Sequence, residues 1–188
     1  MDIFGDNWKD HAERTKANWM QKVKEQDTVL LPGDFSWAMK LEDTLPDFQF
    51  LNALPGRKLL LKGNHDYWWT TLNKMRNFLQ ENNIATVDFI YNNSYCVEDT
   101  IICGTRFWSL NDTKDGKKML EREINRLKLS LEDGIQQFGT QKRIMVCMHY
   151  PPISKAAMAD TEMMQKILAV LQEYSVSICI YGHLHGDS

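Results

Sequence analysis

The sequence predicts one layered α/β domain over residues 1–188, and three observations support this fold class. Four short apolar runs, rich in Val, Ile and Leu, have the length and composition of buried strands: residues 28–31, 58–61, 143–147 and 177–180. Helical patterns separate them. Residues 85–107 break into short β-prone pieces at Asn92-Asn93 and Glu98-Asp99, which predicts antiparallel hairpins. Strands that alternate with helices, together with one antiparallel stretch, favour an α/β or layered α/β/α architecture.

Four segments carry the helical periodicity. Residues 10–26 are polar with sparse apolar positions, whereas residues 69–82 and 161–174 each place several apolar side chains on one face. Residues 115–138 repeat apolar side chains at steps of three and four, which predicts a long amphipathic helix.

The composition excludes several classes of protein. At 43% hydrophobic and 25% charged residues, the chain can bury a continuous core. The 22 Lys and Arg and 25 Asp and Glu give a net charge of −3, which argues against bulk electrostatic binding to nucleic acid or anionic membranes. A phosphate substrate is still allowed, because bound metal ions can supply positive charge. The sequence has neither an apolar stretch of membrane-spanning length nor a secretory signal, so we expect a cytoplasmic protein. It has no CxxC pair, so we expect its cysteines to be buried free thiols.

Ligand-type side chains follow all four apolar runs, usually just after a glycine. The carboxyl ends of parallel strands form one crevice of an α/β sheet, so residues far apart in the sequence are expected to converge there. Gly33, Gly63 and Gly182 allow sharp turns out of the sheet. The residues concerned are Asp34, Asn64, His65, Asp66, His149, His183 and His185.

This set has the chemistry of a metal centre. Mixed imidazole and carboxylate ligands favour Mn, Fe or Zn over Ca or Mg. Each residue also has an ordinary explanation: a Gly-Asp turn, a helix-capping loop, or a hydrogen-bonded histidine at the edge of the core. Four independent strand ends with the same kind of residue favour the metal hypothesis.

Taken in order, Gly33-Asp34, Gly63-Asn64-His65-Asp66, His149 and Gly182-His183-Leu184-His185 resemble the signature of the calcineurin-like metallophosphoesterase superfamily. The resemblance implies a four-layer α/β/β/α sandwich with two divalent metal ions. It also implies that Asp34 bridges the ions, that Asn64, His149 and His183 complete one site, and that His185 binds the second ion.

The same resemblance implies hydrolysis of phosphate mono- or diesters by attack of a metal-bridging hydroxide. His65 would assist the leaving group, oriented by Asp66, and Asn64 would also contact the phosphate. Arg106 is the best-placed arginine for a phosphate contact, although an ion-paired surface arginine is an equal alternative. The expected substrate is a small phosphate ester or a nucleotide.

The sequence departs from the family pattern in one respect, because no Asp-x-His motif precedes Asp34. We therefore expect a chain truncated at both ends that binds one tight ion. Two other classes of function remain open: a degenerate, non-catalytic metal-binding or interaction module, and a metal-dependent hydrolase of a non-phosphate ester. Monoester, diester, nucleotide and phosphoprotein substrates all suit this constellation.

Overall fold

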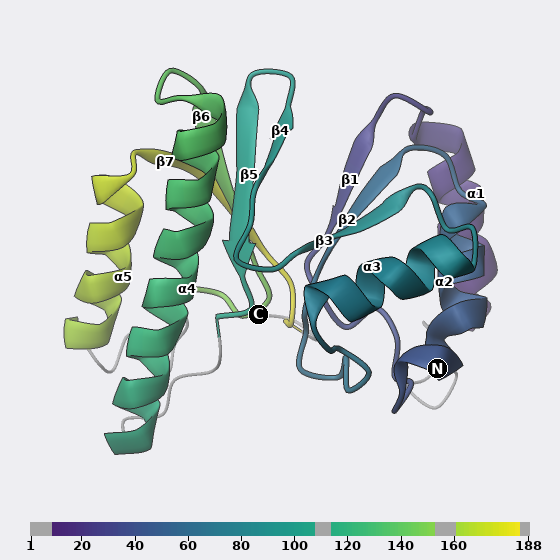
Figure 1. Cartoon of the computed structure of the whole chain (residues 1–188), viewed down its shortest axis with the longest axis horizontal. Helices are drawn as coiled ribbons and strands as arrows, with labels where there is room; N and C mark the ends of the chain where they lie inside the picture. Colours follow the sequence, from purple (N-terminus) through teal and green to yellow (C-terminus); the bar gives the residue numbers. More distant parts are fainter. Residues whose placement is uncertain (1–8, 108–113, 153–160, 185–188) are drawn as a thin grey trace.

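The computed structural model describes residues 9–107, 114–152 and 161–184. Two sheets lie side by side with helices on their outer sides (Figure 1). The elements are α1 (His11–Lys22), β1 (Thr28–Leu31), η3 (Leu41–Thr44), α2 (Leu45–Asn52), β2 (Arg57–Leu61), α3 (Leu72–Glu81), β3 (Val87–Ile90), β4 (Tyr95–Val97), β5 (Thr100–Thr105), α4 (Lys114–Phe138), β6 (Arg143–Met148), α5 (Thr161–Glu173) and β7 (Val176–Tyr181).

Parallel pairing dominates both sheets. The first sheet has the order β1-β2-β3 with all strands parallel, and the second has the order β4-β5-β6-β7, in which only β4 and β5 are antiparallel. The four predicted apolar runs coincide with β1, β2, β6 and β7. The predicted hairpins are confirmed for β4 and β5 but are wrong for β3, which pairs in parallel with β2.

Three apolar clusters hold the layers together. One lies between α4, α5 and the second sheet and includes Leu127, Leu131 and Ile167. Another joins α2 and α3 to the first sheet around Phe48 and Met75. The third lies between the two sheets, where its buried members are Leu59, Leu61, Ile90, Tyr95, Ile102 and Cys147. The described residues therefore stack as helices, sheet, sheet and helices (Figure 1).

Strand β2 ends in three successive leucines, and its packing explains them. Leu60 belongs to the cluster under the helices, whereas Leu59 and Leu61 face the other sheet, and all three are buried. A strand covered on both faces has no solvent side, so apolar residues follow one another without alternation.

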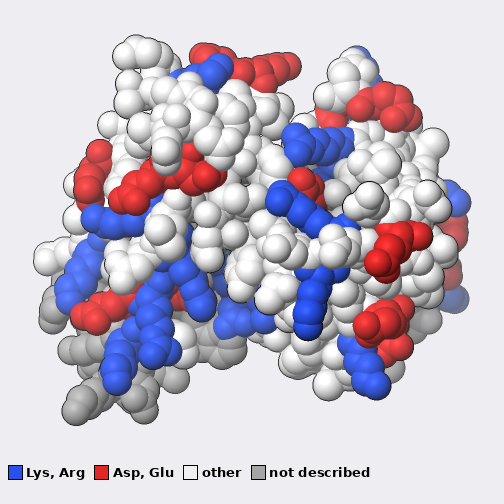
Figure 2. Space-filling model, in the orientation of Figure 1, with Lys and Arg blue, Asp and Glu red and all other residues white. Residues whose placement is uncertain are grey.

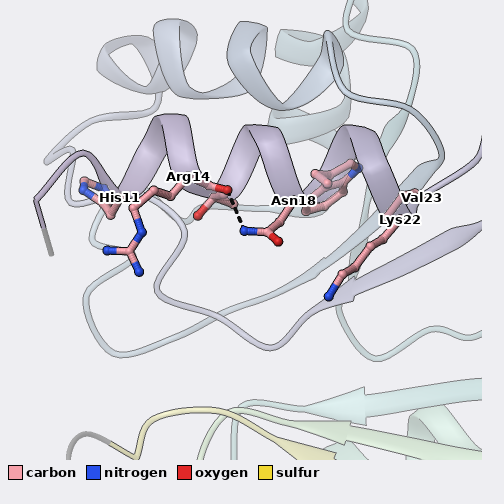
Figure 3. Close-up of a pocket in the computed structure, with 7 residues that line it drawn as sticks. His11, Arg14, Asn18, Lys22 and Val23 are labelled. Atoms are coloured by element: carbon pink, nitrogen blue, oxygen red, sulfur yellow. Dashed lines mark hydrogen bonds between the residues drawn. The ribbon is translucent and has the colours of Figure 1, made fainter. Parts of the chain in front are cut away.

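Helix α1 lies at the edge of the molecule. None of its residues is buried, and it is anchored by Trp19, whose indole N–H donates to the carbonyl of Pro55 at 2.9 Å. The helix lines a shallow hollow with His11, Arg14 and Lys22, in which Asn18 donates to the Arg14 carbonyl (Figure 3). Among the described helices none has the length and apolarity to cross a membrane.

Candidate metal centre

The carboxyl ends of β1, β2, β6 and β7 meet at one locus. Asp34 lies three residues after β1 and Asn64 three residues after β2, whereas His149 directly follows β6 and His183 lies two residues after β7. Asp34, His149 and His183 each offer a ligand atom, and these atoms all lie within 4.8 Å of one another. His185 falls outside the described residues.

His149 is held in the tautomer that a metal requires. Its side chain is 1% exposed, and its Nδ1 lies 2.8 Å from the carbonyl oxygen of Pro32, so Nδ1 carries the proton and donates it to that oxygen. Burial lowers the pKa of His149, which keeps the ring neutral and leaves a lone pair on Nε2. A backbone carbonyl in this position is a common outer partner of ligating histidines.

The atoms facing that lone pair are acceptors too. His149 Nε2 lies 2.6 Å from Asn64 Oδ1 and 3.6 Å from Asp34 Oδ2. His183 Nδ1 lies 2.9 Å from the same Asn64 oxygen. With the proton of His149 on Nδ1, nothing bridges Nε2 and Asn64 Oδ1, and two lone pairs at this distance repel. A cation between them would turn the repulsion into coordination, so the donor set fits a divalent metal ion.

Two glycines let the loops after β1 and β2 approach each other. A Cβ at Gly33, whose φ is +101°, would lie 2.6 Å from the Gly63 Cα, and a Cβ at Gly63 would lie 2.1 Å from Asp34 Oδ1. Both distances are shorter than van der Waals contact allows. The Gly-Asp and Gly-Asn-His-Asp motifs therefore need their glycines for this packing as well as for the turn.

The carboxylate of Asp66 is a buried hub rather than a partner of His65. Its oxygens accept hydrogen bonds from backbone N–H groups of both loops and from the Trp68 indole. The donors are Gly63 N at 2.7 Å, Asp34 N at 2.9 Å, Phe35 N at 3.0 Å, Ser36 N at 3.2 Å and Trp68 Nε1 at 3.2 Å. Burial raises the pKa of Asp66, and the hydrogen bonds from the backbone N–H groups of Gly63, Ser36 and Asp34 oppose that effect. The expectation that Asp66 orients the His65 ring is therefore corrected: Asp66 fixes the loop that carries Asp34.

The His65 ring has aromatic neighbours instead. Trp37 stacks on it with 4.7 Å between ring centroids, and the Tyr67 hydroxyl lies 3.2 Å from Nδ1. The backbone N–H of His65 donates to Asp34 Oδ1 at 2.8 Å, which joins this residue to one of the candidate ligands. Trp37 and Tyr67 are 45% and 54% exposed. The sequence analysis missed both, and the available signal was an aromatic residue close to each glycine motif.

The sequence profile described as calcineurin-like phosphoesterase matches residues 3–187. The chain belongs to this family. Among solved structures, the phosphopantetheinyl hydrolase PptH from Mycobacterium tuberculosis has a similar fold, with a TM-score of 0.53 and 12% sequence identity. The match covers 90% of this chain and 77% of that one. No curated protein is similar enough in sequence to count as a relative.

In this phosphoesterase-family chain, Arg106 connects the metal centre to a neighbouring cavity. Its backbone carbonyl accepts the N–H groups of His149 at 3.2 Å and Tyr150 at 3.1 Å, so the loop after β5 is joined to the loop after β6. Its side chain lines the cavity, where burial lowers its pKa and the nearby carboxylate of Glu123 opposes that shift.

Proposed function

We propose that this chain hydrolyses phosphate mono- or diesters at a divalent-metal centre built by Asp34, Asn64, His149 and His183. The observation that carries the proposal is the close approach of His149 Nε2 to Asn64 Oδ1 with the histidine proton committed to Pro32. His149 is buried and Asn64 is half-buried, and two acceptors that face each other at this distance are costly unless a cation binds between them. The α/β fold, with parallel strands and flanking helices, supports the proposal.

Mn, Fe or Zn suits the proposed ligands, and the complete site of the family would hold two such ions. A bound divalent ion supplies a Lewis acid for the phosphoryl oxygens and activates water as a nucleophile. Asp34 is the carboxylate proposed to bridge two ions. Because the described cluster has four candidate ligands for one ion, we expect this polypeptide to bind about one ion tightly and any second ion far more weakly, with His185 a proposed ligand of the second.

The surrounding side chains suit a phosphate ester. Asn64 lies among the proposed ligands, where its amide can also donate to a phosphate oxygen. His65 stands beside Asp34 and is proposed to donate a proton to the leaving oxygen, a role worth roughly 10²–10⁴ in rate. Arg106 is proposed to bind a phosphate oxygen through its guanidinium, which matches the geometry of a phosphate. The substrate would be a small-molecule ester or a nucleotide.

Metal analysis and turnover on the same samples test the proposal. After dialysis, the wild-type chain should retain about one Mn or Zn and should hydrolyse p-nitrophenyl phosphate or bis(p-nitrophenyl) phosphate slowly. His149→Ala should lose both the metal and the turnover. His11→Ala, on α1, is the matched control and should lose neither.

Two outcomes would favour the other functions. Bound metal without turnover of either phosphate ester would indicate a non-catalytic metal-binding or interaction module. Turnover of p-nitrophenyl acetate that depends on the metal and on His149, without phosphate-ester turnover, would indicate a hydrolase of non-phosphate esters. A wild-type chain that binds no divalent ion would contradict the proposed centre.

A further inference from the structure

A cavity of about 440 Å³ lies next to the metal centre, between the carboxyl ends of β2, β3 and β5 and the side of α4. At about 30 Å³ per water it has room for more than ten water molecules, so it can take a group much larger than a single ion. Its described lining includes Lys62, Thr71, Arg106 and Arg126.

The charge of this lining is one-sided. Lys62, Arg106 and Arg126 contribute three cations, and no acidic side chain is among the described lining residues. The face in Figure 2 shows acidic and basic side chains intermixed over α4, with basic ones extending toward the junction of the two sheets. A lining of one sign is therefore a property of the cavity and not of this face as a whole.

The carboxylate nearest to these cations is already engaged. Glu123 is buried behind the wall, where it accepts from the Thr105 hydroxyl at 2.8 Å and from the Phe107 N–H at 3.0 Å, and it also pairs with Arg126. Two further acids act on these cations: Asp66, which is occupied by its five hydrogen-bond donors, and Asp34, which is a proposed metal ligand. Neither of these acids nor Glu123 is among the described residues that line the cavity.

One further feature of the cavity favours a negatively charged ligand. The N-terminus of α3 borders it, with Thr71 as the capping residue that accepts from the Lys74 N–H, and a helix N-terminus carries partial positive charge.

We propose that this cavity is a subsite for a second anionic group of the substrate, so that preferred substrates carry a phosphate or carboxylate in addition to the ester that is cleaved. Arg106 lines the cavity and is bonded through its backbone to His149, so the subsite and the metal centre share one rigid loop. As a statement about substrates, this inference rests on the proposed phosphoesterase function.

The experiment measures binding by the metal-stripped chain, so that it does not depend on catalysis. Isothermal titration calorimetry with inorganic pyrophosphate and with citrate separates the phosphate and carboxylate forms of the ligand. At least one of the two should bind with one site per chain. Arg126→Gln and Lys62→Met should each weaken that binding about tenfold or more, as expected for a lost charge-assisted hydrogen bond.

Arg122→Gln is the matched control, because Arg122 is an exposed cation of α4, one turn from Arg126, that is not among the residues lining the cavity. It should bind like the wild type. Circular dichroism checks that each variant is folded. If Arg126→Gln does not fold, Lys62→Met tests the subsite in its place. Absence of binding of both anions, or equal weakening in Arg122→Gln and Arg126→Gln, would overturn the subsite.

Turnover distinguishes failure of the subsite from failure of the proposed function. A thymidine 5′-(p-nitrophenyl phosphate) with a 3′-phosphate should have a higher kcat/KM than the same ester without it, and Arg126→Gln should remove the difference. Phosphate-ester turnover with equal kcat/KM for the two esters would overturn the subsite and leave the phosphoesterase function standing. Anion binding by a chain that does not turn over phosphate esters would leave the anion site standing and overturn the phosphoesterase function.

Discussion

Asp66 accepts a hydrogen bond from the backbone N–H of Asp34 at 2.9 Å, across 32 residues of sequence. The side chain after β2 therefore holds the backbone after β1 that carries the proposed bridging carboxylate. Since Asp34 has a φ of 59°, in the left-handed region that side-chain-bearing residues rarely adopt, this hub also stabilises a strained backbone.

Asp66→Asn should lower the free energy of unfolding by roughly 2–4 kcal/mol, because the amide nitrogen brings a donor to face backbone donors in a buried site. Urea denaturation of the metal-free variant measures the change. Asp99→Asn is the control. The Asp99 carboxylate is 70% exposed and forms a long ion pair of 3.6 Å with a lysine, so this substitution should have little effect on the free energy of unfolding. Equal effects of the two substitutions would contradict the hub.

Gly63→Ala should destabilise the chain and weaken metal binding together, because the new methyl group would lie 2.1 Å from Asp34 Oδ1. The comparison is Gly139→Ala, where φ is +84° and no atom lies within 4 Å of the added Cβ. That control should cost only backbone strain, about 1 kcal/mol, and leave metal binding unchanged. Metal titration and thermal unfolding of both variants test the pair, and intact metal binding in Gly63→Ala would refute the packing argument.

His65→Asn should retain the metal and lower kcat, with the largest loss for esters that have poor leaving groups, because those need a proton most. Tyr67→Phe removes the hydroxyl contact with the His65 ring, while Trp37 still stacks on that ring. Its kcat should therefore fall less than that of His65→Asn. Turnover of a series of aryl phosphates measures both variants. An equal loss for good and poor leaving groups would indicate that His65 binds the substrate instead of protonating it.

Three cysteines should resist alkylation in the folded chain. Burial raises the pKa of Cys103 and Cys147 to about 12 and that of Cys179 to about 11, so at pH 8 each is almost wholly the unreactive thiol. Iodoacetamide followed by mass spectrometry should label Cys96 first and the other three only in denaturant. Rapid labelling of Cys103 or Cys147 in the folded chain would contradict their burial.

The same thiols predict how stability depends on pH. Their folded pKa values lie above the unfolded value of about 8.5, so the unfolded chain loses its protons first as the pH rises. Their contribution to the free energy of unfolding is complete below pH 8.5 and should be lost progressively between pH 8.5 and 12. Urea denaturation of wild type and Cys103→Ala across this range measures the contribution, and identical pH dependence in the two proteins would exclude Cys103 as a source.

The sequence by itself determined the α/β class, the four strands whose ends meet at the site, and the long amphipathic helix α4. These features are local: apolar runs and three-to-four spacing depend on neighbouring residues, and the rule that parallel strands end on one side brings Asp34, Asn64, His149 and His183 together without any distance being known. The family motifs added the roles proposed for these residues.

The tertiary structure decided what depends on contacts between distant segments. The parallel pairing of β3, the capture of the Asp66 carboxylate by the loop after β1, and the stacking of Trp37 on His65 all join residues that no periodicity relates. The three cations of the cavity come from the segments that follow β2 and β5 and from α4, and no periodicity relates them either. Local patterns set which faces are apolar, but the free energy of each hydrogen bond and each ring contact depends on geometry that exists only after the sheets have packed.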